Sequence, residues 1–228
     1  MRRHLVLRLA LAAAAALLAT AAVAIAGGKS ESAAQSLIGT FTIKPGTCAN
    51  GKARGTYFRM IFPGGSVASG RFFANPDSSC PDKTYTLATP GRDGGLATGR
   101  YQPTPSPAFD SRGSSLARSI IGPASFSAIR FGVATNRRDA ASGQSLPAPS
   151  IRVVNGKLRG QVQAFTAQWN RLTFNQGSPK PDGSRPATTL PVTGRYDSRT
   201  RAYVLEWTSA IVGGPFNGFT GFWHFEGT

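Results

Sequence analysis

Hydrophobic and polar residues alternate in short runs along most of the chain, and Gly, Pro, Asn or Asp ends most of these runs. This pattern is typical of β-strands joined by turns. No convincing helical period follows the N-terminal region, so we expect an all-β fold. The strands are expected at residues 37–43, 54–62, 66–74, 84–88, 97–101, 125–134, 151–154, 157–169, 190–196, 202–211 and 219–226.

The strand expected over 157–169 changes its buried face partway along. Leu158 and Ala164 share one parity, whereas Phe165 and Trp169 take the other. An extra residue in one strand of an antiparallel pair shifts the parity in this way. We therefore expect a β-bulge or a sharp twist near Ala164.

The last two expected strands have a register that two patterns support independently. A turn centred on Pro215 pairs Trp207 with Trp223 on one face of the hairpin. The same register pairs Glu206 with His224 on the other face. Aromatic pairs and opposite charges each stabilise directly opposed positions, by some tenths of a kcal/mol.

Two parts of the chain repeat a short pattern in the same order. Residues 50–55 and 155–160 both have the sequence Asn-Gly-Lys-X-Arg-Gly, and residues 98–101 and 193–196 are both Thr-Gly-Arg-Tyr. One hypothesis is a duplicated β unit. The alternative is that such turns and strand ends recur by chance in a Gly-rich β protein. The duplicated units would be residues 37–135 and 150–228.

Two polar segments, 102–118 and 136–149, lack the strand pattern and are expected to be loops. The first contains three prolines between residues 103 and 107. The remaining pattern is continuous enough to predict a single β domain over 37–228, preceded by a polar lead at 27–36.

The N-terminus has the layout of a secretory signal peptide. Arg2, Arg3 and Arg8 flank the start of an Ala- and Leu-rich run that ends in Ala24-Ile25-Ala26. We expect a signal helix at 1–26, cleaved after Ala26. The apolar run is short for a membrane anchor, which needs roughly 20 residues, so no transmembrane span is expected after processing. General and twin-arginine export both stay open.

Charge adds a candidate partner to this picture. The chain has 26 Lys and Arg against 10 Asp and Glu, and losing the three arginines of the signal leaves a net charge of +13. Arg suits the bidentate capture of phosphate or carboxylate groups. Anionic wall polymers, acidic polysaccharide and lipid headgroups therefore fit an exported cationic protein. The alternative is compositional, because 20 of the 26 cations are Arg, as expected of a GC-rich bacterial genome. Nucleic acid is not expected as a physiological partner outside the cell.

Cys48 and Cys80 are the only cysteines of a chain expected to be exported. Each lies at a strand end or turn, so we predict a disulfide between them. On the chain-entropy model such a bond contributes roughly 3 kcal/mol.

Few residues are available for catalysis. His224 is the only histidine left after processing, and the chain has no G-x-S-x-G motif for a serine nucleophile. Glu206 and Glu226 are the only glutamates on expected strands, and an ion pair or a solvated face explains them without a substrate. Residues 46–52 have phosphate-loop spacing, but Ala53 stands where Ser or Thr would hold magnesium. We therefore lean towards a protein without catalytic residues, metal or cofactor.

Two sets of residues are candidates for ligand binding. Arg137 and Arg138 are adjacent in a loop and could contact an anion, and the aromatic C-terminus could line an apolar cavity around Trp207, Trp223 and Phe219.

We expect a monomeric, extracytoplasmic all-β protein, an antiparallel barrel or a sandwich of about 8–10 strands, that is secreted or associated with the cell envelope. Its expected function is the non-catalytic binding of an anionic envelope polymer. The alternatives are a barrel that binds a small apolar ligand and a secreted hydrolase that uses Glu206, Glu226 or His224.

Overall fold

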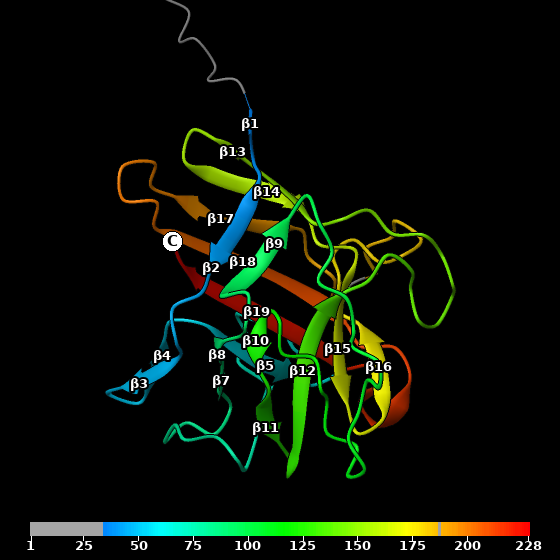
Figure 1. The fold of residues 1–228 in the computed structure, drawn as a ribbon. Helices are drawn as coiled ribbons and strands as arrows, with labels where there is room; N and C mark the ends of the chain where they lie inside the picture. Colours follow the sequence, from blue (N-terminus) through cyan, green and yellow to red (C-terminus); the bar gives the residue numbers. More distant parts are fainter. Residues whose placement is uncertain (1–33, 187) are drawn as a thin grey trace, which may run out of the picture. The chain divides into compact units, whose positions relative to one another are not determined.

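The computed structural model describes residues 34–186 and 188–228, and its regular structure is almost entirely β (Figure 1). The expected signal peptide at 1–26, and residues 27–33 of the polar lead, lie outside the described residues. The strands are β1 (Gln35–Leu37), β2 (Gly39–Thr42), β3 (Thr47–Ala49), β4 (Lys52–Arg54), β5 (Tyr57–Ile61), β6 (Phe72–Phe73), β7 (Thr86–Leu87), β8 (Thr89–Pro90), β9 (Gly95–Thr98), β10 (Ile121–Gly122), β11 (Ala124–Phe126), β12 (Ile129–Thr135), β13 (Ser150–Val154), β14 (Lys157–Gln161), β15 (Phe165–Trp169), β16 (Leu172–Asn175), β17 (Val192–Tyr196), β18 (Tyr203–Ala210) and β19 (Thr220–Gly227). A short 3-10 helix, η1 (Gly214–Phe216), lies between β18 and β19.

The strands form five antiparallel sheets in the described part of the chain. The largest has nine strands in the order β1-β13-β14-β17-β18-β19-β5-β6, with β7 also paired to β5. The second has four strands in the order β11-β12-β15-β16. Three two-stranded sheets, β2–β9, β8–β10 and β3–β4, complete the set.

The two larger sheets pack against each other through one hydrophobic core. Phe165 of the four-stranded sheet lies 5.1 Å from Trp207 and 4.9 Å from Trp223 of the nine-stranded sheet, between ring centroids. Phe58 and Phe131 join the sheets in the same way, 5.7 Å apart. These rings are buried. Along the strands, apolar side chains therefore point into the space between the two sheets, and the polar side chains at alternate positions point outward.

The all-β, antiparallel prediction is confirmed, but the barrel alternative is wrong for the described residues because none of their sheets closes. The expected total of about 8–10 strands is too low, because the described residues form nineteen strands, nine of them in the largest sheet. Alternation in the sequence predicted the longer strands. It did not predict the strands of two or three residues, several of which pair with strands that are distant in the sequence.

The predicted bulge or sharp twist near Ala164, within one strand over 157–169, is wrong. The chain ends β14 at Gln161, starts β15 at Phe165, and passes from the nine-stranded sheet to the four-stranded sheet between them. The change of parity therefore marks a change of sheet. Val162 and Ala164 are both buried at this crossing.

The strand expected at 125–134 is a hairpin. Ser127 and Ala128 form its two-residue turn with φ of 49° and 64°, and Phe126 pairs with Ile129. Ser and Ala rarely adopt positive φ, so no sequence pattern predicted a turn at these two residues. The strand expected at 66–74 is also mostly turn, because only Phe72 and Phe73 pair with β5.

Residues 102–118 and 136–149 contain no extended strand, as predicted. The repeated sequence patterns do not share a topology. Asn50-Gly51 and Asn155-Gly156 both form hairpin turns, but β4 pairs only with β3, whereas β14 pairs with β13 and β17. These pairings give no support to a duplicated unit.

Candidate functional site

The outer face of the nine-stranded sheet carries a row of cations on three neighbouring strands. Arg152 lies on β13, Lys157 and Arg159 on β14, and Arg195 on β17, and all four are exposed. Residues of opposite parity on the same three strands, such as Ile151, Leu158 and Val192, are buried. The alternation of each strand therefore directs these cations to solvent.

The register of the sheet places these cations directly opposite one another. Arg152 pairs with Arg159 across β13 and β14, and Lys157 pairs with Arg195 across β14 and β17. No carboxylate of the described residues lies within 4.0 Å of any of the four. Like charges in directly opposed positions destabilise a sheet, so this face is favourable for a bound anion.

A groove of about 470 Å³ runs over part of this face. Arg152, Arg159 and Arg185 line it together with the exposed hydroxyl residues Ser36 and Ser150, and no Asp or Glu is among its lining residues. We call this site the arginine groove. Its charge is of one sign and its hydroxyl groups add hydrogen-bond donors, which is the chemistry that phosphate and carboxylate ligands need.

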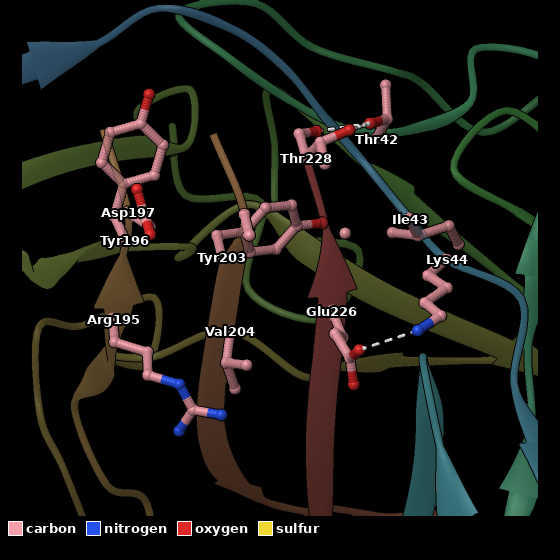
Figure 2. Close-up of a pocket in the computed structure, with 12 residues that line it drawn as sticks. Thr42, Ile43, Lys44, Arg195, Tyr196, Asp197, Tyr203, Val204, Glu226 and Thr228 are labelled. Carbon is pink, nitrogen blue, oxygen red and sulfur yellow. Dashed lines mark hydrogen bonds and ion pairs between the residues drawn. The ribbon is translucent and has the colours of Figure 1, made fainter. Parts of the chain in front are cut away.

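A larger cleft of about 750 Å³ lies at the ends of β17, β18 and β19 (Figure 2). Its charges are mixed. Lys44 Nζ lies 3.4 Å from Glu226 Oε1, and Arg195 and Asp197 also line the cleft. Hydrogen bonds from the backbone N–H groups of Thr200 and Arg199 lower the pKa of Asp197. The carboxylates here compete with an anionic ligand for the cations, so the arginine groove is the better anion site.

Glu206, His224 and Glu226 meet on the outer face of β18 and β19, as the predicted register requires. His224 Nδ1 lies 2.6 Å from Glu206 Oε1, and His224 Nε2 lies 3.9 Å from Glu226 Oε2. The ring of Tyr57 stacks on the imidazole with centroids 4.4 Å apart, and burial raises the pKa of Tyr57 to about 12.

The carboxylates of this cluster already have partners within the protein. Glu226 Oε2 accepts a hydrogen bond from the backbone N–H of Gly55, at 3.1 Å, and Glu226 Oε1 contacts Lys44. Glu206 contacts His224. In the described part of the chain, no group of three or more His, Cys, Asp or Glu residues could hold a metal ion.

Trp207 and Trp223 pair as predicted, but inside the core. Trp207 Nε1 donates to the Gln176 carbonyl at 2.9 Å, and Trp223 Nε1 donates to Gln176 Oε1 at 3.2 Å. One buried glutamine therefore satisfies both indole N–H groups. A cavity of about 40 Å³ touches Trp223, far below the roughly 300 Å³ at which small-ligand pockets begin.

The other predicted ligand residues lie in separate places. Phe219 is half-buried beside Phe62, with centroids 5.2 Å apart. Arg137 and Arg138 are exposed in the loop at 136–149. The Arg137 guanidinium lies 5.2 Å from the centroid of the Tyr101 ring, and Arg138 donates to the Gly143 carbonyl at 3.2 Å.

The predicted disulfide between Cys48 and Cys80 is confirmed. Their Cα atoms are 5.6 Å apart. The bond ties the β3–β4 hairpin to the turn that precedes β7.

Sequence reasoning missed the arginine groove, although part of its signal was present. Arg152 and Arg159 share the outward parity of the β13–β14 hairpin, and Asn-Gly between two strands is typical of a two-residue hairpin turn, so their opposition follows from the register. Arg185 belongs to a segment without strand pattern, and Ser36 reaches the groove because β1 pairs with β13 far along the chain. Neither had a local signal.

No protein-family model, curated protein or solved structure matches this chain. Within residues 34–186 and 188–228, no helix has the length and apolar character needed to cross a membrane.

Proposed function

We propose that this protein is an exported, non-catalytic binding protein that holds an anionic envelope polymer in the arginine groove. The proposed export rests on the signal-like sequence at 1–26 and is consistent with the Cys48–Cys80 disulfide. The observation that supports the proposed ligand most directly is that Arg152 lies opposite Arg159 and Lys157 lies opposite Arg195, with no carboxylate between them.

A bound anion would relieve both repulsions. Each guanidinium presents a planar fork of donors that fits a phosphate or carboxylate. The cost of holding two cations on opposed strand positions is present in the free protein and falls when a ligand charge lies between them.

The arrangement fits a polymer better than a single small anion. The cations extend from Arg185 and Arg152 at the groove to Arg195 on β17. Neighbouring strands are about 4.8 Å apart, and alternate residues of one strand about 6.8 Å apart. Consecutive anionic groups of one chain can therefore contact several of these cations at once.

The proposed function is non-catalytic because the candidate catalytic groups are engaged within the protein. Glu206 contacts His224, and Glu226 contacts Gly55 and Lys44. The cavity beside Trp223, at about 40 Å³, is too small to support the alternative of a bound apolar ligand.

The test is retention on beads that carry long-chain polyphosphate or polygalacturonate. The R152Q/R159Q variant should bind at least about tenfold more weakly than the wild type at an ionic strength of about 0.1 M. Wild-type retention should fall steeply between about 0.05 M and about 0.5 M NaCl, because exposed charge pairs are screened by salt.

The R137Q/R138Q variant is the matched control, since it removes the same charge from the loop at 136–149. It should retain binding within about threefold of the wild type. Equal losses in the two double variants would mean that net charge alone drives retention, and a loss only in R137Q/R138Q would place the site in the loop. Either result, or binding that ignores salt, would overturn the proposal.

A further inference from the structure

Three hairpin loops meet at one end of the described unit and expose apolar side chains. They connect β5 to β6, β15 to β16, and β18 to β19, and the turn between β18 and β19 lies beside β16 (Figure 1). The rings of Phe62 and Phe219 are 5.2 Å apart, which joins the first loop to the third. A Cβ placed on Gly214 would lie 3.0 Å from Leu172 Cδ1, which joins the third loop to the second.

Four large apolar side chains are exposed on these loops or at the adjoining start of β16: Phe62 (38%), Val67 (40%), Leu172 (37%) and Val212 (72%). We call this group the apolar tip. Only three other large hydrophobic residues of the described chain are exposed, and they lie in other segments: Ile38, Leu116 and Leu190. Exposed apolar groups that gather in one place mark an interaction site more strongly than scattered ones.

Aromatic rings underlie the apolar tip. The Phe216 ring lies 5.2 Å from Trp169 and 5.8 Å from Phe219, and the Phe73 ring lies 5.8 Å from Phe219. These rings are half-buried and pack on the core. The tip is therefore continuous with the interior and is held in a fixed arrangement.

The charged side chains of the three loops are all positive. The loops at 62–71, 170–172 and 211–219 contain no Asp or Glu, and two of them carry the exposed cations Arg71 and Arg171. No carboxylate of the described residues lies within 4.0 Å of either. Arg171 contacts the turn that contains Asp110, but the Asp110 carboxylate pairs with another cation: its Oδ2 lies 3.8 Å from Arg130 Nη2.

We propose that the apolar tip docks on the surface of an anionic lipid bilayer. Phe62, Val67 and Val212 would enter the boundary between headgroups and acyl chains, while Arg71 and Arg171 contact lipid phosphates. Charge complementarity favours this occupant over a second copy of the chain, because the excess of cations makes two copies repel each other. The inference does not depend on the arginine groove.

The experiment is co-flotation of the full processed chain with vesicles of phosphatidylcholine and phosphatidylglycerol in a ratio of about 3:1. Wild-type protein should float with these vesicles and should bind pure phosphatidylcholine more weakly. The F62S/V67S/V212S variant should lose at least about tenfold in apparent affinity, because the apolar contribution to surface binding is removed.

Two variants serve as controls. I38S/L116S/L190S removes the same number of exposed apolar side chains outside the tip, and R137Q/R138Q removes charge from the loop at 136–149. Both should bind within about threefold of wild type. In addition, the fluorescence of an F62W variant should shift to shorter wavelength with vesicles if the tip enters the bilayer.

Three results would overturn the proposal. The first is equal binding of the tip variant and the wild type, and the second is an equal loss in the tip variant and in I38S/L116S/L190S. The third is a wild-type dimer in light scattering that the tip substitutions dissociate, without vesicle binding. That last outcome would assign the surface to a second copy of the chain.

Discussion

Lys180 is a buried cation that is held by oxygen atoms without a formal charge. Its Nζ donates to the carbonyl of Asn175 at 2.9 Å, the hydroxyl of Ser209 at 2.8 Å and the carbonyl of Ala210 at 2.5 Å. No carboxylate of the described residues lies within 4.0 Å of it. Burial lowers the pKa of Lys180 to about 8. This side chain ties the end of β16 to β18 without an ion pair.

The lowered pKa of Lys180 predicts a pH dependence of stability. In the unfolded chain a lysine has a pKa of about 10.4, so between about pH 8 and pH 10 the unfolded state binds more protons than the folded state. The free energy of unfolding should therefore rise with pH across this window. Urea denaturation at about pH 7.5, 8.5 and 9.5 measures this rise.

The K180M variant should lack that rise, whereas K157M, which changes an exposed lysine of β14, should keep it. Parallel pH profiles for the wild type and K180M would contradict the assignment. Burial also raises the pKa of Tyr57 to about 12. That tyrosine lowers stability only above about pH 10, outside the window of the test.

At the scale of elements, the hairpin of β13 and β14 positions three cations of the candidate site. Its turn residues Asn155 and Gly156 have φ of 49° and 73°, which is the left-handed region that a two-residue turn of this type needs. Val154 pairs with Lys157 directly beside this turn. The turn therefore fixes the register that sets Arg152 against Arg159.

Replacing Asn155 by Ala should destabilise the protein by about 1 kcal/mol, because Ala is strained at positive φ. The N50A variant is a matched comparison, since Asn50 has φ of 52° in the turn of the β3–β4 hairpin. That two-stranded sheet lies outside the larger sheets, so N50A should change global stability less. Chemical denaturation of both variants measures the difference, and an equal or larger loss in N50A would contradict the account.

Element by element, the sequence predicted what local patterns determine. Alternation and the Pro215 turn predicted the pairing of Trp207 with Trp223, and Asn155-Gly156 predicted the hairpin of β13 and β14, but the β3–β4 hairpin at Asn50-Gly51 was not predicted. It missed the Ser127-Ala128 turn, because residues without turn preference adopt positive φ there under tertiary packing. The change of parity near Ala164 predicted a bulge or a sharp twist in one strand, because parity alone does not say which sheet a strand joins.

For the candidate site, the sequence predicted the class of ligand but not the residues that form the groove. Excess Arg indicated an anionic ligand, but the adjacent pair in sequence, Arg137 and Arg138, lies in a loop. The opposed pair, Arg152 and Arg159, is brought together by strand register. Arg185 joins them through the long-range packing of a segment with no periodic pattern, which a single sequence does not encode locally.

At the scale of the whole unit, the two larger sheets use their inner faces to form the core. The outer face of the nine-stranded sheet is left to carry charge, cationic on β13, β14 and β17 and more acidic on β18 and β19, where Glu206 and Glu226 lie. Under the proposed function, this division of charge would set the direction in which an anionic polymer lies on the sheet. It would lie over the cationic strands and avoid the neighbouring carboxylates.

The most direct test of this account is a titration of the full processed chain with polyphosphate, followed by NMR of the arginine side-chain Nε–Hε groups. Saturable shifts should appear first at Arg152, Arg159 and Arg185, and those of Arg137 and Arg138 should stay small. The same shifts should vanish at about 0.5 M NaCl. Shifts confined to Arg137 and Arg138, or spread evenly over all exposed arginines, would contradict the arginine groove as the binding site.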